Sequence, residues 1–225
     1  MKIEYIYHSG FTVETENYFL VFDYFKGDIN LKKNKKTIVF STHGHPDHFN
    51  PQVLKWLEEN SHILYVLSSD IKTEPSTHTY IMEPYETLKL FDTQIESFGS
   101  TDLGLSFLVK VDNKTIFFAG DLNWWYWDED SDEEKSSMEK AFKGEVEKLI
   151  KKNDDIDVVF FPVDPRLDDN YYLGGKYVID KLKPIAFIPM QFGDKYEITK
   201  DFIHKMRSTT TNIVEISNKN EVFEL

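Results

Sequence analysis

The feature that most constrains the fold of this chain is a group of four metal-binding side chains within six residues. These are His43, His45, Asp47 and His48. They follow an apolar run, residues 37–41, that has the composition of a buried strand. Because neighbours on a strand point to opposite faces and neighbours on a helix diverge by about 100°, only a loop can direct all four toward one point. The sequence therefore predicts a strand that ends in a ligand-bearing loop. An ordinary turn is the alternative interpretation, because histidine, aspartate and Pro46 are common loop residues.

This His-x-His-x-Asp-His pattern resembles the signature of the metallo-β-lactamase superfamily. A second strand-like run, residues 117–121, ends in Gly120-Asp121, where the superfamily places the carboxylate that bridges two metal ions. The opening is similar too, with His8-Ser9-Gly10-Phe11 followed by an apolar strand that ends in Asp23. Further counterparts lie in residues 100–104, 120–123 and 162–166. The resemblance covers nearly the whole chain and is greatest to a small bacterial hydrolase-like branch.

Two departures from the superfamily pattern concern the metal ligands. The superfamily usually supplies one histidine near residues 99–102 and another at the end of a late strand. Here the first stretch has no histidine, and the second has Gln191 at the ligand position. The other histidines do not lie at these positions: His8, His62, His78 and His204. We expect structural roles for His62, His78 and His204. For His8 we expect a structural hydrogen bond, and a position near the mouth of the site is the alternative. The resemblance therefore implies a depleted ligand set.

The donors that remain form two groups. The first group is His43, His45 and Asp121; the second is Asp47, His48, Asp121 and the amide oxygen of Gln191. An amide oxygen is neutral and suits oxygen-preferring cations better than zinc. We expect one divalent ion or two weakly bound ions; the resemblance favours zinc, with manganese or iron as alternatives. A site that binds no metal is the alternative.

The chemistry implied by the resemblance is metal-dependent hydrolysis of a small molecule. A bound cation lowers the pKa of a water ligand from about 15.7 towards 7 and so provides hydroxide. Asp47 and Asp121 are the expected catalytic residues: Asp47 relays a proton and Asp121 anchors the nucleophile. Asp23 is expected to orient a ligand histidine by a hydrogen bond, although a carboxylate in a turn is the alternative. The competing function is a metal-free binding or regulatory protein that retains the fold.

Candidate substrate contacts come from an aromatic run and one arginine. The run Trp124–Trp127 begins three residues after Asp121, so Trp124 and Trp125 are expected to wall a substrate pocket. Packing between the sheets, or contact between copies of the chain, is the alternative. Arg166 could bind a phosphate or carboxylate, or simply pair with the nearby Asp164.

Composition limits the other function classes. The chain has 225 residues, 40% of them hydrophobic, which is enough for a single domain over residues 1–225. The net charge of −13 and a single basic run, residues 32–36, disfavour nucleic acid as a partner. No apolar run approaches the roughly 18 residues that span a membrane. The absence of cysteine excludes disulfides and thiolate ligands. Together with a start that lacks a cleavage site, it favours a cytoplasmic location.

The hydrophobic pattern predicts a β-rich chain with four helices. Strands are expected at 2–7, 11–15, 18–24, 37–41, 62–67, 79–82, 87–90, 93–98, 105–111, 115–119, 157–161, 185–189, 213–216 and 221–225. Helices are expected at 51–58, 134–152, 173–182 and 199–207, the first capped by Asn50 and the second by a Ser131–Glu134 capping box. Asn113-Lys114 predicts a tight hairpin. With the resemblance, this pattern indicates an α/β, four-layer αβ/βα sandwich of the metallo-β-lactamase type.

Overall fold

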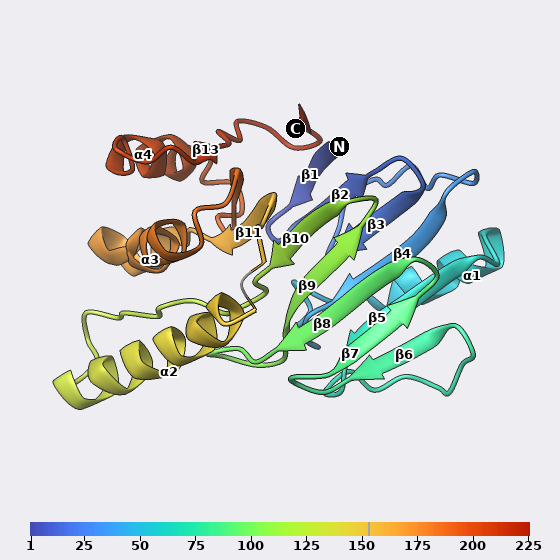
Figure 1. The fold of residues 1–225 in the computed structure, drawn as a ribbon, viewed down its shortest axis with the longest axis horizontal. Helices are drawn as coiled ribbons and strands as arrows, with labels where there is room; N and C mark the ends of the chain where they lie inside the picture. Colours follow the sequence, from blue (N-terminus) through green and yellow to red (C-terminus); the bar gives the residue numbers. More distant parts are fainter. Residues whose placement is uncertain (153) are drawn as a thin grey trace.

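The computed structural model describes residues 1–152 and 154–225, which form two seven-stranded sheets packed face to face (Figure 1). The first sheet contains, in spatial order, β14 (Val222–Glu224), β1 (Lys2–Tyr7), β2 (Gly10–Glu14), β3 (Tyr18–Phe22), β4 (Lys36–Ser41), β5 (Ile63–Ser68) and β6 (Thr79–Met82). The second contains β13 (Asn212–Ile213), β12 (Ala186–Met190), β11 (Val158–Pro162), β10 (Lys114–Phe118), β9 (Ser106–Val111), β8 (Thr93–Phe98) and β7 (Thr87–Leu90).

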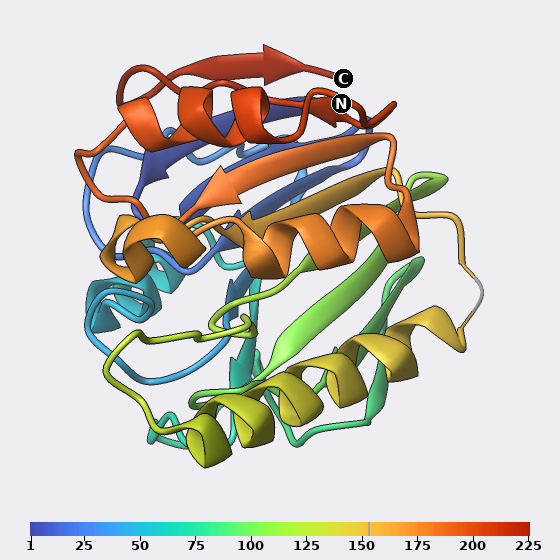
Figure 2. The same ribbon diagram turned by 90° about the vertical axis from the view of Figure 1, so that its left-hand side faces the viewer.

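Helices cover the outer faces of both sheets, which completes the four layers. The helical elements are η1 (Pro51–Lys55), α1 (Trp56–Glu59), α2 (Asp132–Ile150), η2 (Pro165–Asn170), α3 (Leu173–Leu182) and α4 (Glu197–Lys205). Figure 2 shows α2, α3 and α4 side by side over the second sheet. The short η1–α1 segment covers the first sheet, where Val53 packs in a small separate core and accepts a hydrogen bond from the Tyr65 hydroxyl. The sandwich predicted from the sequence is therefore confirmed.

The main core lies between the sheets and is rich in phenylalanine. Phe22 of the first sheet stacks on Phe40 of the adjacent strand and on Phe118 of the opposite sheet, with ring centroids 4.7 Å apart in both pairs. All three side chains are fully buried. Each such ring contributes about 1.5–3 kcal/mol through burial, so this stack helps to fix one sheet against the other.

Most predicted elements are present, with small differences at their ends. The helix expected at 51–58 divides into a 3₁₀ turn and one α-turn, although Asn50 caps it as expected by accepting from the Gln52 N–H at 3.0 Å. The capping box is confirmed, and it starts α2 at Asp132, two residues earlier than expected. The β9–β10 turn is Asp112-Asn113 rather than Asn113-Lys114, because these two residues adopt positive φ angles of 46° and 58°. The 3₁₀ segment η2 was not predicted.

The topology brings the chemically important loops to one end of the sandwich. Strands β3, β4 and β5 run parallel in the first sheet, as do β10, β11 and β12 in the second. The carboxyl ends of neighbouring parallel strands meet at one edge of a sheet, which is where ligands bind in open α/β sheets. The residues that follow these strand ends include Asp23, His43, Asp121, Asp164 and Gln191. None of the helices in the described part of the chain has the length and apolar character needed to cross a bilayer.

Candidate metal centre

The loop after β4 is held in a compact turn that points its imidazoles inward. The backbone N–H groups of His48 and Phe49 both donate to the carbonyl of His45, at 3.0 and 2.9 Å. The Gly44 N–H donates to the Asp70 carboxylate at 2.7 Å, and the Leu105 N–H donates to the carbonyl of Thr42 at 2.8 Å. Contacts from both sheets therefore fix the loop that carries the His-x-His-x-Asp-His pattern.

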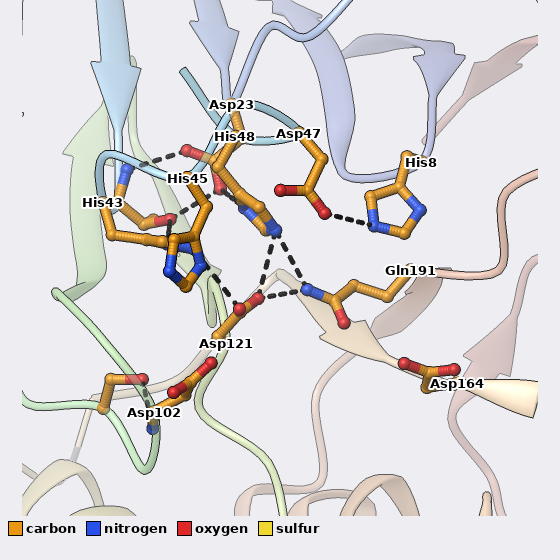
Figure 3. Close-up of polar contacts among 12 residues, drawn as sticks. His8, Asp23, His43, His45, Asp47, His48, Asp102, Asp121, Asp164 and Gln191 are labelled. Atoms are coloured by element: carbon orange, nitrogen blue, oxygen red, sulfur yellow. Dashed lines mark hydrogen bonds and ion pairs between the residues drawn. The ribbon is translucent and has the colours of Figure 1, made fainter. Parts of the chain in front are cut away.

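Three histidine rings and one aspartate converge at this loop (Figure 3). The Nε2 atom of His43 lies 3.0 Å from His45 Nδ1 and 3.4 Å from Asp121 Oδ2, and His48 Nε2 lies 3.2 Å from Asp121 Oδ1. Two donor atoms that are each about 2.1 Å from one cation lie roughly 3.0 Å apart in octahedral and 3.4 Å apart in tetrahedral coordination. The spacing of these donors therefore fits a divalent cation.

Asp121 lies between the histidines and offers one carboxylate oxygen to each side. It follows β10 through Gly120, whose φ is +56° and whose position leaves no room for a Cβ, since such an atom would be 2.8 Å from the carbonyl oxygen of Leu105. Burial raises the pKa of the Asp121 carboxyl to about 6, and the nearby His48 opposes that rise. The two oxygens face His43 and His48 separately, which is the arrangement that a bridging carboxylate needs.

Asp23 holds His48 and the start of the loop together. Its fully buried carboxylate accepts from the Thr42 N–H at 2.8 Å, from the Thr42 hydroxyl at 2.7 Å and from His48 Nδ1 at 2.7 Å. Burial by itself lowers the pKa of His48, but the charges of Asp23 and Asp121 outweigh this effect and raise the pKa to about 9. With Nδ1 held by Asp23, Nε2 is directed toward Asp121.

The same hydrogen bonds define which nitrogen of His43 is free. The Thr42 hydroxyl donates its only proton to Asp23, so it accepts from His43 Nδ1 across 3.2 Å. The unprotonated nitrogen of His43 is then Nε2, which faces His45 and Asp121. Burial, reinforced by His48, lowers the pKa of His43 to about 4, so this ring is neutral at pH 7, as metal binding requires.

Gln191 lies at the site, but its amide nitrogen faces the cluster. Its Nε2 donates to Asp121 Oδ1 and lies 3.1 Å from His48 Nε2. Its Oε1 is buried and has no hydrogen-bond partner among the described residues. Such an orphaned oxygen is costly in a folded protein; rotation of the amide by 180° would turn it toward the cluster, where a cation would satisfy it. The sequence-based placement of Gln191 beside the metal site therefore agrees with the geometry, and its role as a ligand remains a prediction.

Asp47 forms an ion pair with His8 beside His48. His8 Nε2 lies 3.4 Å from Asp47 Oδ2. A ring nitrogen of His48 lies within 4.8 Å of the ligand atoms of both residues. The hydrogen bond from His8 holds the pKa of Asp47 well below its usual range, although partial burial opposes this. This position agrees with the alternative considered for His8, near the mouth of the site, and not with a purely structural hydrogen bond.

Asp102 also lies at the site, and the sequence interpretation missed it. Ligand atoms of Asp102, His45 and Asp121 lie within 4.8 Å of one another. A usable signal was present, because Asp102 stands in the stretch 99–102 where the superfamily supplies a histidine. A search for any metal-binding side chain there, rather than for histidine alone, would have found it.

The aromatic run divides between the core and the site. The ring of Trp124 packs 6.0 Å from Phe142 of α2 and 6.5 Å from Tyr177 of α3, which corrects the expectation that it walls the substrate pocket. Trp125 and Trp127 stack instead and line a pocket of about 250 Å³. The ring of Trp124 is held against the helices by this packing, and the Tyr126 N–H donates to the Trp124 carbonyl in a tight turn at 2.8 Å.

Arg166 borders that pocket and a second one. The first pocket also contains Asp102 and Asp121, and the second, of about 550 Å³, contains Asp47 and Gln191. Arg166 donates to the buried Asp164 from Nε and Nη2, so the local pairing considered as an alternative is present. Its side chain is nevertheless 63% exposed, which leaves the other guanidinium N–H groups facing the pockets.

Comparison with known proteins places these features in a family. The sequence profile described as beta-lactamase superfamily domain matches residues 2–137. The chain is 24% identical to the UPF0173 metal-dependent hydrolase YtkL of Bacillus subtilis, over 89% of each protein. It is 26% identical to a UPF0173 metal-dependent hydrolase of Desulforamulus reducens, over the full length of both. Among solved structures, the metallo hydrolase Igni18 of Ignicoccus hospitalis superposes with a TM-score of 0.64 at 16% identity, with both chains fully covered. The profile match spans more than half of the sequence, and the chain therefore belongs to the beta-lactamase superfamily.

Proposed function

We propose that this protein is a metal-dependent hydrolase of a small molecule with an ester, lactone, amide or phosphodiester bond. One observation carries the proposal. Nitrogen atoms of His43, His45 and His48 and the buried carboxylate of Asp121 lie together, with 3.0–3.4 Å between neighbouring donor atoms. The names of the relatives, metal-dependent hydrolases, support the same activity.

The residues of this site would have different roles in the reaction. His43, His45, His48 and Asp121 would hold the cation, which when bound supplies a nucleophilic hydroxide at neutral pH and polarises the bond under attack. Asp121 would anchor the nucleophile between the two histidine groups. Asp47 is ionised at neutral pH because the hydrogen bond from His8 holds its pKa well below the usual range, so it would contribute negative charge beside the cation and accept a hydrogen bond from the attacking water.

The two pockets beside the site indicate what kind of substrate would fit. Trp125 and Trp127 offer flat apolar surfaces for a ring or an acyl group. Arg166 offers N–H groups to a carboxylate, phosphate or carbonyl oxygen on the substrate. A molecule with an apolar part and one anionic or strongly polar group would satisfy both.

A screen of reconstituted protein tests the proposal. Chelator-stripped protein should be inactive, and addition of Mn²⁺, Fe²⁺ or Zn²⁺ should restore hydrolysis of at least one member of a panel of esters, lactones, amides and phosphodiesters. The variant His43→Ala should lose that activity, while His62→Ala, which removes an exposed histidine, should retain it. Activity that survives both chelation and His43→Ala would refute the metal mechanism.

A metal-free binding protein is the second candidate, and one contact favours it. The Gln191 amide and the protonated His48 both donate toward Asp121 Oδ1, so the charge of this carboxylate can be balanced without a cation. Metal analysis of protein purified without chelator separates the two functions, because a working site is normally occupied. Less than about 0.2 equivalents of every transition metal would favour the binding role.

A further inference from the structure

We propose that Asp102 and His8 are metal ligands. They take the place of the two ligand histidines that the superfamily pattern contains and this chain lacks. Asp102 completes a first cation site with His43, His45 and Asp121, and His8 completes a second with Asp47, His48 and the shared Asp121. This inference rests on the proposed function and specifies how the site is built.

Asp102 is held where a ligand to the first site must lie. The Thr101 hydroxyl donates to the carbonyl of Asn123 at 2.6 Å and accepts from the Asn123 N–H at 2.9 Å. This reciprocal pair ties the Asp102 loop to the loop that follows Asp121. On the other side, Gly104 adopts a φ of +80° against the backbone of Thr42, which fixes the loop to the start of the histidine turn.

The carboxylates of Asp102, which is exposed, and of Asp121, which is buried, together favour a cation at the first site. Asp102 and Asp121 present carboxylate oxygens within 4.8 Å of each other, so they repel when both are ionised. Within residues 1–152 and 154–225, neither carboxylate forms an ion pair with lysine or arginine, and the Asp102 carboxylate accepts no hydrogen bond from the protein. A divalent ion shared with His43 and His45 would remove that repulsion.

His8 is fixed at the second site by an unusual backbone turn. It has a positive φ of 59°; its N–H donates to the Tyr5 hydroxyl at 2.9 Å, and its carbonyl accepts from the Gln191 N–H at 3.1 Å. Gln191 also has a positive φ, of 68°. Positive φ angles are costly for residues other than glycine, and such strain is concentrated at functional sites; here the two strained residues are joined by the hydrogen bond between their backbones. The turn places the His8 imidazole beside Asp47 and His48.

The amide of Gln191 also fits a ligand at this position once it is rotated by 180°, because the orphaned Oε1 then takes the place of the Nε2 that faces Asp121 and His48. Oε1 is buried without a partner in the described part of the chain, and the same side chain contacts Asp121 and His48. Figure 3 shows Gln191 and His8 on the same side of His48, opposite His43 and His45. The second site would therefore lie between these groups, and the first between His43, His45 and Asp102.

The proposed ligands predict a metal preference different from that of a site with a histidine in place of Asp102. Each proposed site contains two imidazoles and two carboxylates, and the added oxygen donors suit manganese better than a third imidazole would. The variant Asp102→His should therefore shift the ratio of Zn²⁺ to Mn²⁺ affinity toward zinc, by at least tenfold.

Calorimetric titration of the chelator-stripped full chain with MnCl₂ tests the ligand assignment. Wild-type protein should bind two equivalents, and Asp102→Asn and His8→Asn should each weaken one of the two by at least tenfold. Asparagine is chosen at position 8 because it tolerates a positive φ. The matched controls are Asp155→Asn and His62→Asn, which alter exposed residues at the opposite, amino-terminal ends of β11 and β5; they should bind as wild type does.

Electron paramagnetic resonance provides a second readout that a structural role would not change. Two Mn²⁺ ions bridged by Asp121 should give an exchange-coupled spectrum, whereas either asparagine variant loaded with one equivalent should give the spectrum of an isolated ion. Circular dichroism of the metal-free variants verifies that they fold.

Different outcomes identify which idea fails. A variant that binds two equivalents with wild-type affinity and coupling overturns the assignment of its residue. If His43→Ala abolishes binding while Asp102→Asn and His8→Asn do not weaken it, this inference is wrong and the proposed function stands. If wild-type protein binds neither Mn²⁺ nor Zn²⁺, the proposed function fails with it.

Discussion

Replacing Asp23 with asparagine should weaken metal binding although Asp23 itself contacts no cation in the proposed site. The carboxylate accepts three hydrogen bonds, two from Thr42 and one from His48 Nδ1. Asparagine has nearly the same shape but only one acceptor oxygen. If that oxygen keeps the Thr42 N–H, the new NH₂ group faces the Thr42 hydroxyl and the His48 Nδ1–H. His48 then loses the acceptor that fixes its tautomer and directs Nε2 toward Asp121.

The size of the effect follows from these contacts. Loss of a hydrogen-bond partner behind a ligand histidine typically costs 10–100-fold in metal affinity, or about 1.4–2.8 kcal/mol. The Thr42 hydroxyl can rotate to accept from the new amide, whereas His48 Nδ1–H cannot change its direction without moving the ring. One unsatisfied buried donor costs about 1–3 kcal/mol of unfolding free energy, and we expect the metal-free variant to be less stable by that amount.

Asp112 provides a matched control for this experiment. Its carboxylate also accepts three hydrogen bonds, from the Thr15 hydroxyl and from the backbone and side-chain amides of Asn17, but it lies in the β9–β10 turn, away from the site. Calorimetry should show weaker Mn²⁺ and Zn²⁺ binding for Asp23→Asn alone, while urea unfolding of chelated protein should show a loss of stability for both variants. Wild-type metal affinity in Asp23→Asn, together with reduced stability, would refute the orienting role.

Four further predictions concern the same site. Asp121→Ala should abolish hydrolysis and leave the circular dichroism spectrum unchanged, and retained activity in a clean preparation would contradict the mechanism. Metal binding at pH 7 should release protons, because the pKa of His48 is raised from 6.5 to about 9 in the metal-free protein. The affinity for metal should therefore rise as the pH rises toward 9. The stability that protonated His48 gives to the metal-free fold is complete below pH 6.5 and should be lost between pH 6.5 and about 9. Calorimetry in buffers of different ionisation enthalpy measures this release, and no release would show that His48 does not bind the ion. Gln191→His should raise zinc affinity by at least tenfold, and unchanged affinity would remove Gln191 from the ligand position. Gly104→Ala should cost more than about 1 kcal/mol in urea unfolding, because its Cβ would lie 2.0 Å from the Thr42 carbonyl oxygen; unfolding at the wild-type midpoint would contradict this.

The sequence by itself determined the features that depend on neighbouring residues. Alternation of apolar residues located the strands, and Ser131 with Glu134 located the start of α2 to within two residues, because strand and cap geometry depend on residues a few positions apart. The histidine-rich turn could be identified as a loop for the same reason. The family resemblance then supplied the pairing of that turn with Asp121, which lies more than seventy residues away in the chain and which no local pattern could have located.

Only the tertiary structure decided which distant side chains complete the site. His8 reaches Asp47 because its turn bonds to the backbone of Gln191, and Asp102 reaches His45 because Thr101 pairs with Asn123. The direction of Trp124 was likewise decided by its packing on α2 and α3. Each of these positions depends on contacts between segments far apart in the chain, and the energy of such contacts is not encoded in any short stretch of sequence.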